Sequence, residues 1–158
     1  MSASEFEDLA ERIRLELVDI ERVLKRISDI LEQARHSNDD YYLDATALNL
    51  HGFYSGTERV LTLIAETVEG SIPNGDSWHL LLLQQMAEEI PNVRPAVISE
   101  DTFGRLDEYR RFRHVVRNVY TYNLDPTKLE KLVSAAPAVF AQFQDEVLTF
   151  ALFLEEKK

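Results

Sequence analysis

Residues 105–120 combine side chains that can hold a phosphate with one that can move a proton. This stretch contains His114, Asn118 and Tyr120 together with five arginines, at Arg105, Arg110, Arg111, Arg113 and Arg117. Arginine presents a planar fork of donors that matches phosphate oxygens, histidine transfers protons near neutral pH, and an amide can donate to a developing oxyanion. A metal-free site that cleaves RNA needs these groups: one helps the 2′-hydroxyl to attack, and the others hold the charge that grows on phosphorus.

Helical spacing gathers part of this set on one side of a predicted helix. At about 100° per residue, Arg113, Arg117 and Tyr120 form one stripe, and His114 and Asn118 form the neighbouring column. The alternative interpretation is a solvated face whose cations pair with nearby carboxylates, because charge runs on helices are usually solvated. Spacing alone leaves both interpretations open.

The overall charge limits how such a cluster can be used. The chain has 158 residues and a formal net charge of -11, and a uniformly negative surface repels a polyanion. The segment from Arg105 to Arg117 is nevertheless net positive, with five arginines against Asp107 and Glu108. The composition therefore excludes a basic coat for nucleic acid and permits one focused phosphate site.

The same composition bounds the architecture. With 45% hydrophobic residues, the chain is long enough for one domain with a real core, so we predict a single domain over residues 1–158. There is no cysteine, which excludes disulfides and thiolate metal sites. No secretory leader and no apolar run of about 18 residues is found. We therefore expect a soluble, cytoplasmic protein.

Apolar residues at steps of three and four predict an all-α bundle of about five helices, because no segment alternates as a strand does. The expected helices cover residues 4–35, 41–68, 76–90, 100–122 and 126–155.

The breaks between these helices carry recognisable signals. Gly70 ends the second helix, and Asp76 is expected to cap the third. Asp125 and Pro126 are expected to be the N-cap and first residue of the fifth, which Pro137 should kink or split.

The other three histidines and the single tryptophan are expected to have structural rather than catalytic roles. We interpret His36 as a solvent-exposed residue where the first helix ends. His51 and His79 are interpreted as polar packing residues, because neither has a second ligand at metal spacing. Trp78 is assigned to the core or an interface. No motif indicates a metal or another cofactor.

The stretch "RHVVRNVY", with "LDP" soon after, resembles the motif of HEPN-domain ribonuclease toxins of the HepT kind. In that motif an arginine is followed by four to six residues, the first usually polar, then histidine, any residue and tyrosine. These positions fall on Arg113, His114, Asn118 and Tyr120. The segment "LHGFYSGTERVLTLIAETVEGSIPNGDSWHLLLLQQM" also resembles the second and third helices of HepT-like proteins. The resemblance covers roughly residues 5–155.

One departure affects the expected chemistry. The motif's proton-handling histidine is Asn118 here, and an amide cannot act as a general base at neutral pH. Either His114, one turn earlier, takes over the proton transfer, or the domain is catalytically silent and survives as a binding module. A purely structural bundle is a third possibility.

The resemblance implies metal-independent RNA cleavage at a site shared by two protomers, with Arg110 and Arg117 also binding substrate. Arg113 and Asn118 lie about 140° apart around a helix, too divergent to grip one phosphate from one helix, which makes a homodimer plausible. The resemblance further implies a minimal nucleotidyltransferase antitoxin that adds AMP to Tyr120 and thereby fills the phosphate pocket. The predicted partners are thus a second copy, this antitoxin and RNA.

Overall fold

The computed structural model describes residues 2–37, 40–120 and 123–157 and confirms an all-α fold. Within these residues there is no strand, and one isolated bridge joins Ile90 to Arg94. The helices are α1 (Ala3–His36), α2 (Tyr41–Ile64), α3 (Trp78–Met86), α4 (Glu100–Asn118) and α5 (Pro126–Glu156), with a π-helical turn, η1 (Ala65–Glu69), continuing α2.

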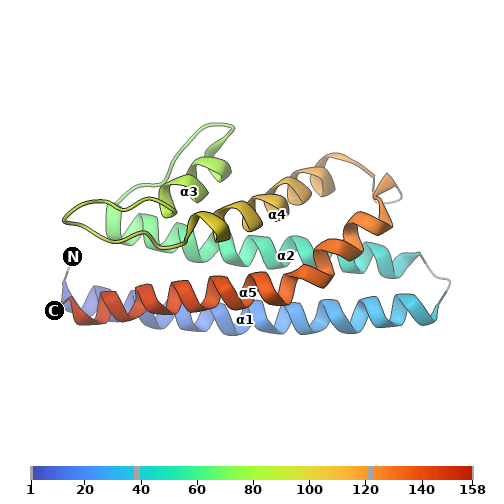
Figure 1. The fold of residues 1–158 in the computed structure, drawn as a ribbon, viewed down its shortest axis with the longest axis horizontal. Helices are drawn as coiled ribbons and strands as arrows, with labels where there is room; N and C mark the ends of the chain where they lie inside the picture. Colours follow the sequence, from blue (N-terminus) through green and yellow to red (C-terminus); the bar gives the residue numbers. More distant parts are fainter. Residues whose placement is uncertain (1, 38–39, 121–122, 158) are drawn as a thin grey trace.

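The three long helices form the body of the molecule. Figure 1 shows α1, α2 and α5 running along the long axis, with both chain termini at one end. The shorter α3 and α4 lie together on one side of this body, and α4 packs against α2 and α5. None of the described helices is long and apolar enough to cross a membrane.

The predicted apolar stripe of α1 is its buried face, because residues three and four apart project from the same side of a helix. Its members are Leu9, Ala10, Ile13, Leu17, Ile20, Leu24, Ile27 and Leu31. Three aromatic rings join the other helices. Phe53 of α2 makes edge contacts with Tyr109 of α4 at 5.3 Å and with Phe140 of α5 at 6.5 Å between ring centroids. The position of α4 on the body is thus fixed by ring packing in the core.

The third helix is shorter than the sequence predicts at both ends. It begins after Ser77, whose side chain makes no cap hydrogen bond, so the expected cap at Asp76 was wrong. Beyond Met86 the chain is held by the buried guanidinium of Arg94. It donates to the carbonyls of Gln85, Glu88 and Pro95 and to the Glu69 carboxylate at 2.8–3.0 Å. These bonds satisfy carbonyl groups at the end of α3 and in the segment that follows it.

The fourth helix also ends early. Its last residue is Asn118, and Val119 adopts an extended backbone with φ -129°. The predicted end at Tyr122 lies outside the described residues, as do residues 38 and 39 of the predicted turn after α1. The start of α5 is confirmed, because the Asp125 side chain accepts a hydrogen bond from the Thr127 amide at 3.0 Å and Pro126 is the first helical residue. Pro137 lies inside α5 without splitting it, and Figure 1 shows the helix changing direction in its N-terminal half.

Candidate functional site

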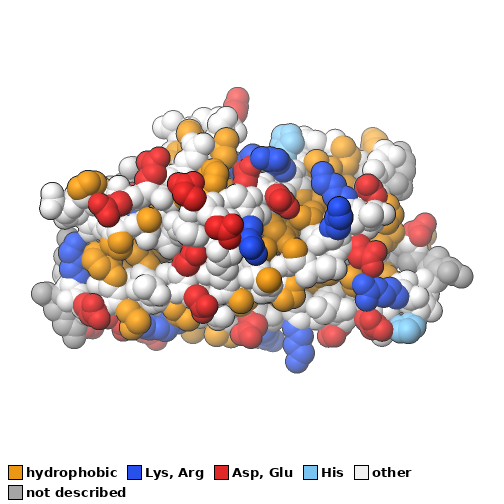
Figure 2. Space-filling model, in the orientation of Figure 1, with side chains coloured by type: hydrophobic (Ala, Val, Ile, Leu, Met, Phe, Trp, Pro, Cys, Tyr) orange, Lys and Arg blue, Asp and Glu red, His pale blue; other side chains and the backbone are white. Residues whose placement is uncertain are grey.

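A cavity of about 280 Å³ lies between the start of α3 and the C-terminal half of α4. Five of the six predicted site residues line it, because they lie on successive turns of the α4 face that is turned toward α3. The lining residues are Asp76, Ser77, His79, Leu80, Arg110, Arg113, His114, Arg117 and Asn118. Figure 2 shows Lys and Arg side chains along α4 beside a histidine, on a surface where acidic groups are interspersed.

The cavity removes one argument for a shared site. Arg113 and Asn118 diverge around the helix, yet both line this cavity, because Arg110 and His114 lie between them and α3 supplies the opposite wall. One chain thus places Arg113 and Asn118 on the wall of one cavity, so their divergence around the helix does not by itself require a second protomer. The homodimer itself stays a prediction.

Tyr120 stands apart from the other predicted site residues. It follows the last residue of α4, its side chain is 72% exposed, and it is not among the residues that line the cavity. The stripe predicted from helical spacing thus ends at Arg117. A continuous helix to residue 122 would have kept Tyr120 on that stripe, but the extended backbone at Val119 turns the chain away.

The arginines of α4 divide into a paired and an unpaired group. Arg105 pairs with Asp101 at 3.0 Å. Arg110 and Arg111 both pair with the buried carboxylate of Asp107, at 2.6 and 2.7 Å. For this first part of the helix the solvated-face interpretation is largely correct.

The second part differs. Among the described residues no carboxylate pairs with Arg113 or Arg117, and the Arg113 Nε is buried without a hydrogen-bond partner. A buried donor without a partner costs free energy unless a ligand or water satisfies it. These two guanidiniums therefore form the part of the cavity wall best suited to an anion.

Their positive potential reaches the neighbouring helix α2. The pKa of His51 is lowered, first by its burial and then by the charges of Arg113 and Arg117. A positive charge on His51 would therefore be repelled by the two guanidinium groups.

Asn118 is engaged with the helix rather than turned wholly to the cavity. Its Nδ2 donates to the carbonyl of His114 at 2.6 Å and lies 3.4 Å from the Nδ1 of that ring. The Asn118 amide, at the motif's histidine position, thus stabilises the end of α4 and contacts His114. The His114 ring itself is exposed.

The structure adds a histidine that sequence reasoning did not assign to the site. His79, at the start of α3, lines the cavity, and its Nδ1 lies 2.6 Å from the Glu58 carboxylate of α2. The Glu58 residue is only 7% exposed. The ring of Trp78 lies 3.7 Å from the His79 ring, centroid to centroid. No spacing signal could have found this pair, because its members are 21 positions apart on different helices.

Tyr54 lies close to the same carboxylate. Burial, and then the negative charge of Glu58, raise the pKa of the Tyr54 hydroxyl above its ordinary value. The phenol therefore stays neutral at physiological pH.

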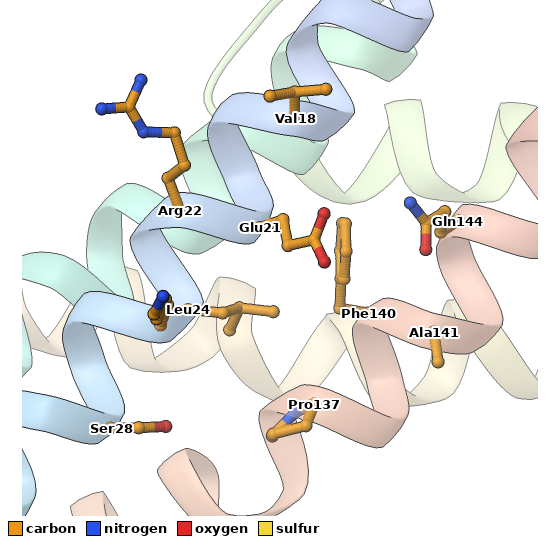
Figure 3. Close-up of a pocket in the computed structure, with 10 residues that line it drawn as sticks. Val18, Glu21, Arg22, Leu24, Ser28, Pro137, Phe140, Ala141 and Gln144 are labelled. Carbon is orange, nitrogen blue, oxygen red and sulfur yellow. The ribbon is translucent and has the colours of Figure 1, made fainter.

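In the part of the chain that the structure describes, no group of three or more His, Asp or Glu side chains could hold a metal ion. A larger groove of about 680 Å³ runs between α1 and α5 (Figure 3), where Pro137 and Phe140 lie opposite Leu24 and Glu21. It contains no imidazole and mixes aliphatic with oppositely charged side chains, so the α3–α4 cavity is the better candidate for chemistry.

Comparison with known proteins supports the resemblance noted in the sequence. A family model described as HepT-like protein matches residues 45–154, a span that contains every residue lining the α3–α4 cavity. No curated protein and no solved structure gave a significant match.

Proposed function

Because the chain belongs to the HepT-like family, we propose that it is the RNA-cleaving toxin of a toxin–antitoxin pair and that the α3–α4 cavity is its site. The observation that carries the proposal is that Arg113 and Arg117, which pair with no carboxylate among the described residues, line one cavity with the imidazole of His114. Planar donor forks hold a phosphodiester, and an imidazole transfers a proton during its cleavage. No metal is required for these steps.

The roles follow from the contacts of each side chain. Arg113 and Arg117 bind the scissile phosphate and stabilise the charge that develops on it. Arg110, held by Asp107 at 2.6 Å, contributes positive charge at the edge of the cavity and binds the flanking backbone. His114 transfers a proton, and Asn118 positions it through the contact with its carbonyl.

The test is cleavage of a mixed RNA substrate by purified protein in EDTA. Arg113→Ala should lower the rate by roughly 100-fold or more, the scale of lost transition-state charge stabilisation. Arg105→Ala is the matched control, because Arg105 lies on the same helix, pairs with Asp101 and does not line the cavity. An inert wild type, or equal losses in both variants, would refute the assignment.

We also propose that the protein acts as a two-fold homodimer with α4 beside the axis. Two valines support this, because Val115 and Val119 are 37% and 41% exposed near the end of the helix that carries the arginines. An isologous contact over α4 would cover them and bring two cavities together. Sedimentation should give a dimer at tens of micromolar, and Val115→Asp should shift it to monomer. A wild type that sediments as a monomer would contradict this arrangement.

We propose that a nucleotidyltransferase antitoxin adds AMP to Tyr120. The phenol is exposed, so a second protein can reach it, and Tyr120 follows the cavity residue Asn118 by two positions in the chain. Arg117 would then pair with the phosphate of the added AMP in place of RNA.

Co-expression with a cognate nucleotidyltransferase should add AMP mass to Tyr120 and abolish cleavage, whereas Tyr120→Phe should stay unmodified and active. Tyr109 is an internal control, because its buried hydroxyl donates to the Leu132 carbonyl at 2.7 Å and is inaccessible. Modification mapped to another tyrosine would show that the acceptor was assigned wrongly.

A catalytically silent binding module is the second candidate. It is favoured by Asn118, whose amide carries no transferable proton and is bonded to the helix backbone. In that case the protein would bind its nucleotidyltransferase partner with unchanged affinity in the Arg113→Ala variant and would not cleave RNA.

A further inference from the structure

Cleavage of RNA by its own 2′-hydroxyl requires two proton transfers, one from the attacking hydroxyl and one to the departing 5′-oxygen. His114 supplies only one group for these steps, and Asn118 supplies none. This inference rests on the proposed function and asks where the second group is. Only one other titratable ring lines the cavity in the part of the chain that the structure describes, and it is His79 of α3.

The His79 ring is held in one orientation by two contacts. A carboxylate accepts but does not donate, so the Nδ1–H of His79 donates to the Glu58 Oε2 at 2.6 Å. Trp78 covers one face of the ring at 3.7 Å. In the neutral ring this contact leaves Nε2 as the nitrogen without a hydrogen, so Nε2 is the atom that can accept a proton.

Burial strengthens this arrangement. The side chains of His79 and Glu58 are 22% and 9% exposed, so their hydrogen bond is shielded from water. A carboxylate bonded to one imidazole nitrogen fixes the tautomer and stabilises the imidazolium that forms when the other nitrogen takes a proton.

The charges around the pair favour the same role. Arg110, Arg113, His114 and Arg117 of α4 line the cavity with His79, and Asp76 lies at the edge on the α3 side. Glu58 of α2 is the buried carboxylate in contact with the ring. The cations across the cavity bind the phosphate whose neighbouring hydroxyl must lose its proton.

We propose that His79 is the general base of the cleavage reaction and that Glu58 is its positioning residue. The Nε2 of His79 takes the proton of the 2′-hydroxyl, and that oxygen forms a bond to phosphorus. The bond from phosphorus to the 5′-oxygen breaks, and the 5′-oxygen takes a proton from protonated His114. The products are a 2′,3′-cyclic phosphate and a free 5′-hydroxyl, so atoms and charge balance without any co-reactant.

The test compares His79→Gln, Glu58→Gln and the control His36→Gln in RNA cleavage with EDTA. His36 also contacts a carboxylate, Glu32 at 2.8 Å, but lies exposed at the end of α1, away from the cavity. His79→Gln should lower kcat by about 100-fold or more with little change in KM, because a general base acts in the transition state. Glu58→Gln should lower kcat by roughly 10-fold or more through loss of the tautomer control, and His36→Gln should be unchanged.

Two further measurements separate a base from a structural residue. Imidazole added to a His79→Gly variant should restore part of the rate, and it should not do so for Arg113→Ala. An RNA with sulfur replacing the 5′-oxygen at the cleaved bond needs no acid for its leaving group. On it His79→Gln should stay slow, whereas His114→Ala should recover toward wild type.

The outcomes distinguish this inference from the proposed function. An inert wild type would overturn both. An active wild type that loses activity in Arg113→Ala but keeps it in His79→Gln would overturn only the assignment of His79. Recovery of His79→Gln on the sulfur-substituted RNA would overturn its role as base. Thermal unfolding of each variant identifies any loss that comes from unfolding, and imidazole rescue then decides the assignment.

Discussion

The close contact between α1 and α2 predicts that alanine in place of Gly56 lowers the free energy of unfolding, whereas alanine in place of Gly52 raises it. A Cβ added at Gly56 would lie 2.7 Å from the Cγ1 of Ile20 and 3.3 Å from its Cδ1. A Cβ added at Gly52, one turn earlier on α2, would meet only the Val23 Cγ1 at 4.0 Å. Replacing each glycine by alanine therefore adds the same methyl group to one crowded and one open position.

The magnitude follows from these distances. Carbon atoms are at their best separation near about 3.5–4.0 Å, so the new methyl at position 56 would be roughly 1 Å too close. The Ile20 Cγ1 can move only by a change of the χ1 rotamer, and Ile20 is buried in the core, so we take the upper part of the range for overpacking, about 2–3 kcal/mol. Alanine recovers about 1 kcal/mol of helix propensity at either position. Gly56→Ala should thus cost about 1–2 kcal/mol, and Gly52→Ala should gain about 0.5–1 kcal/mol.

Urea unfolding of the two variants and the wild type measures these free energies directly. Combining Gly56→Ala with Ile20→Ala should give a favourable coupling energy, because the shortened side chain removes the atoms that the new methyl meets. A Gly56→Ala protein as stable as the wild type, or two variants that shift in the same direction, would refute this account of the α1–α2 contact.

Two other predictions concern buried polar groups. Burial, and then the charges of Arg113 and Arg117, lower the pKa of His51 below its ordinary value of 6.5. On acidification the unfolded chain therefore takes up a proton at this residue before the folded chain does. The free energy of unfolding should fall as pH drops through about 6.5, and His51→Gln should fall less between pH 7.5 and 5.5; an identical pH dependence would contradict this. Arg94→Ala removes the hydrogen bonds that the guanidinium donates to the Glu69 carboxylate and to the carbonyls of Gln85, Glu88 and Pro95, and it should cost about 3–5 kcal/mol in urea unfolding. A loss under about 1 kcal/mol would show that water replaces the guanidinium.

The fold was largely predictable because its strongest signals are local. The spacing of apolar residues in α1 predicts which of its residues are buried. The pair Asp125 and Pro126 predicts the start of α5 at the correct position. The predicted ends of α3 and α4 were wrong for different reasons. Beyond Met86 the side chain of Arg94 donates to the carbonyls of Gln85 and Glu88, six to nine positions earlier, and helical periodicity carries no signal for such side-chain contacts. The extended backbone at Val119 ends α4 without a glycine or proline to mark it.

The site was predictable only where it lies on one helix. Arg110, Arg113, His114, Arg117 and Asn118 share a face of α4, and helical spacing alone indicates that they are neighbours. His79 and Glu58 reach the same site from two other helices, and their contact depends on how α3 packs against α2 and α4. Tyr120 was misplaced on the stripe because the predicted helix was too long. Tertiary packing, which a periodic pattern does not encode, determines these positions.

The most direct test of the account uses one oligonucleotide made of DNA with a single ribonucleotide, incubated with the protein in EDTA. In the proposed mechanism, the arginines and imidazoles that line the cavity act on a phosphate that is attacked by the 2′-hydroxyl of the adjoining ribose. The account therefore predicts cleavage only on the 3′ side of the ribonucleotide, with a 2′,3′-cyclic phosphate on one fragment and a 5′-hydroxyl on the other. Cleavage of the all-DNA strand, or products with a 5′-phosphate, would contradict it.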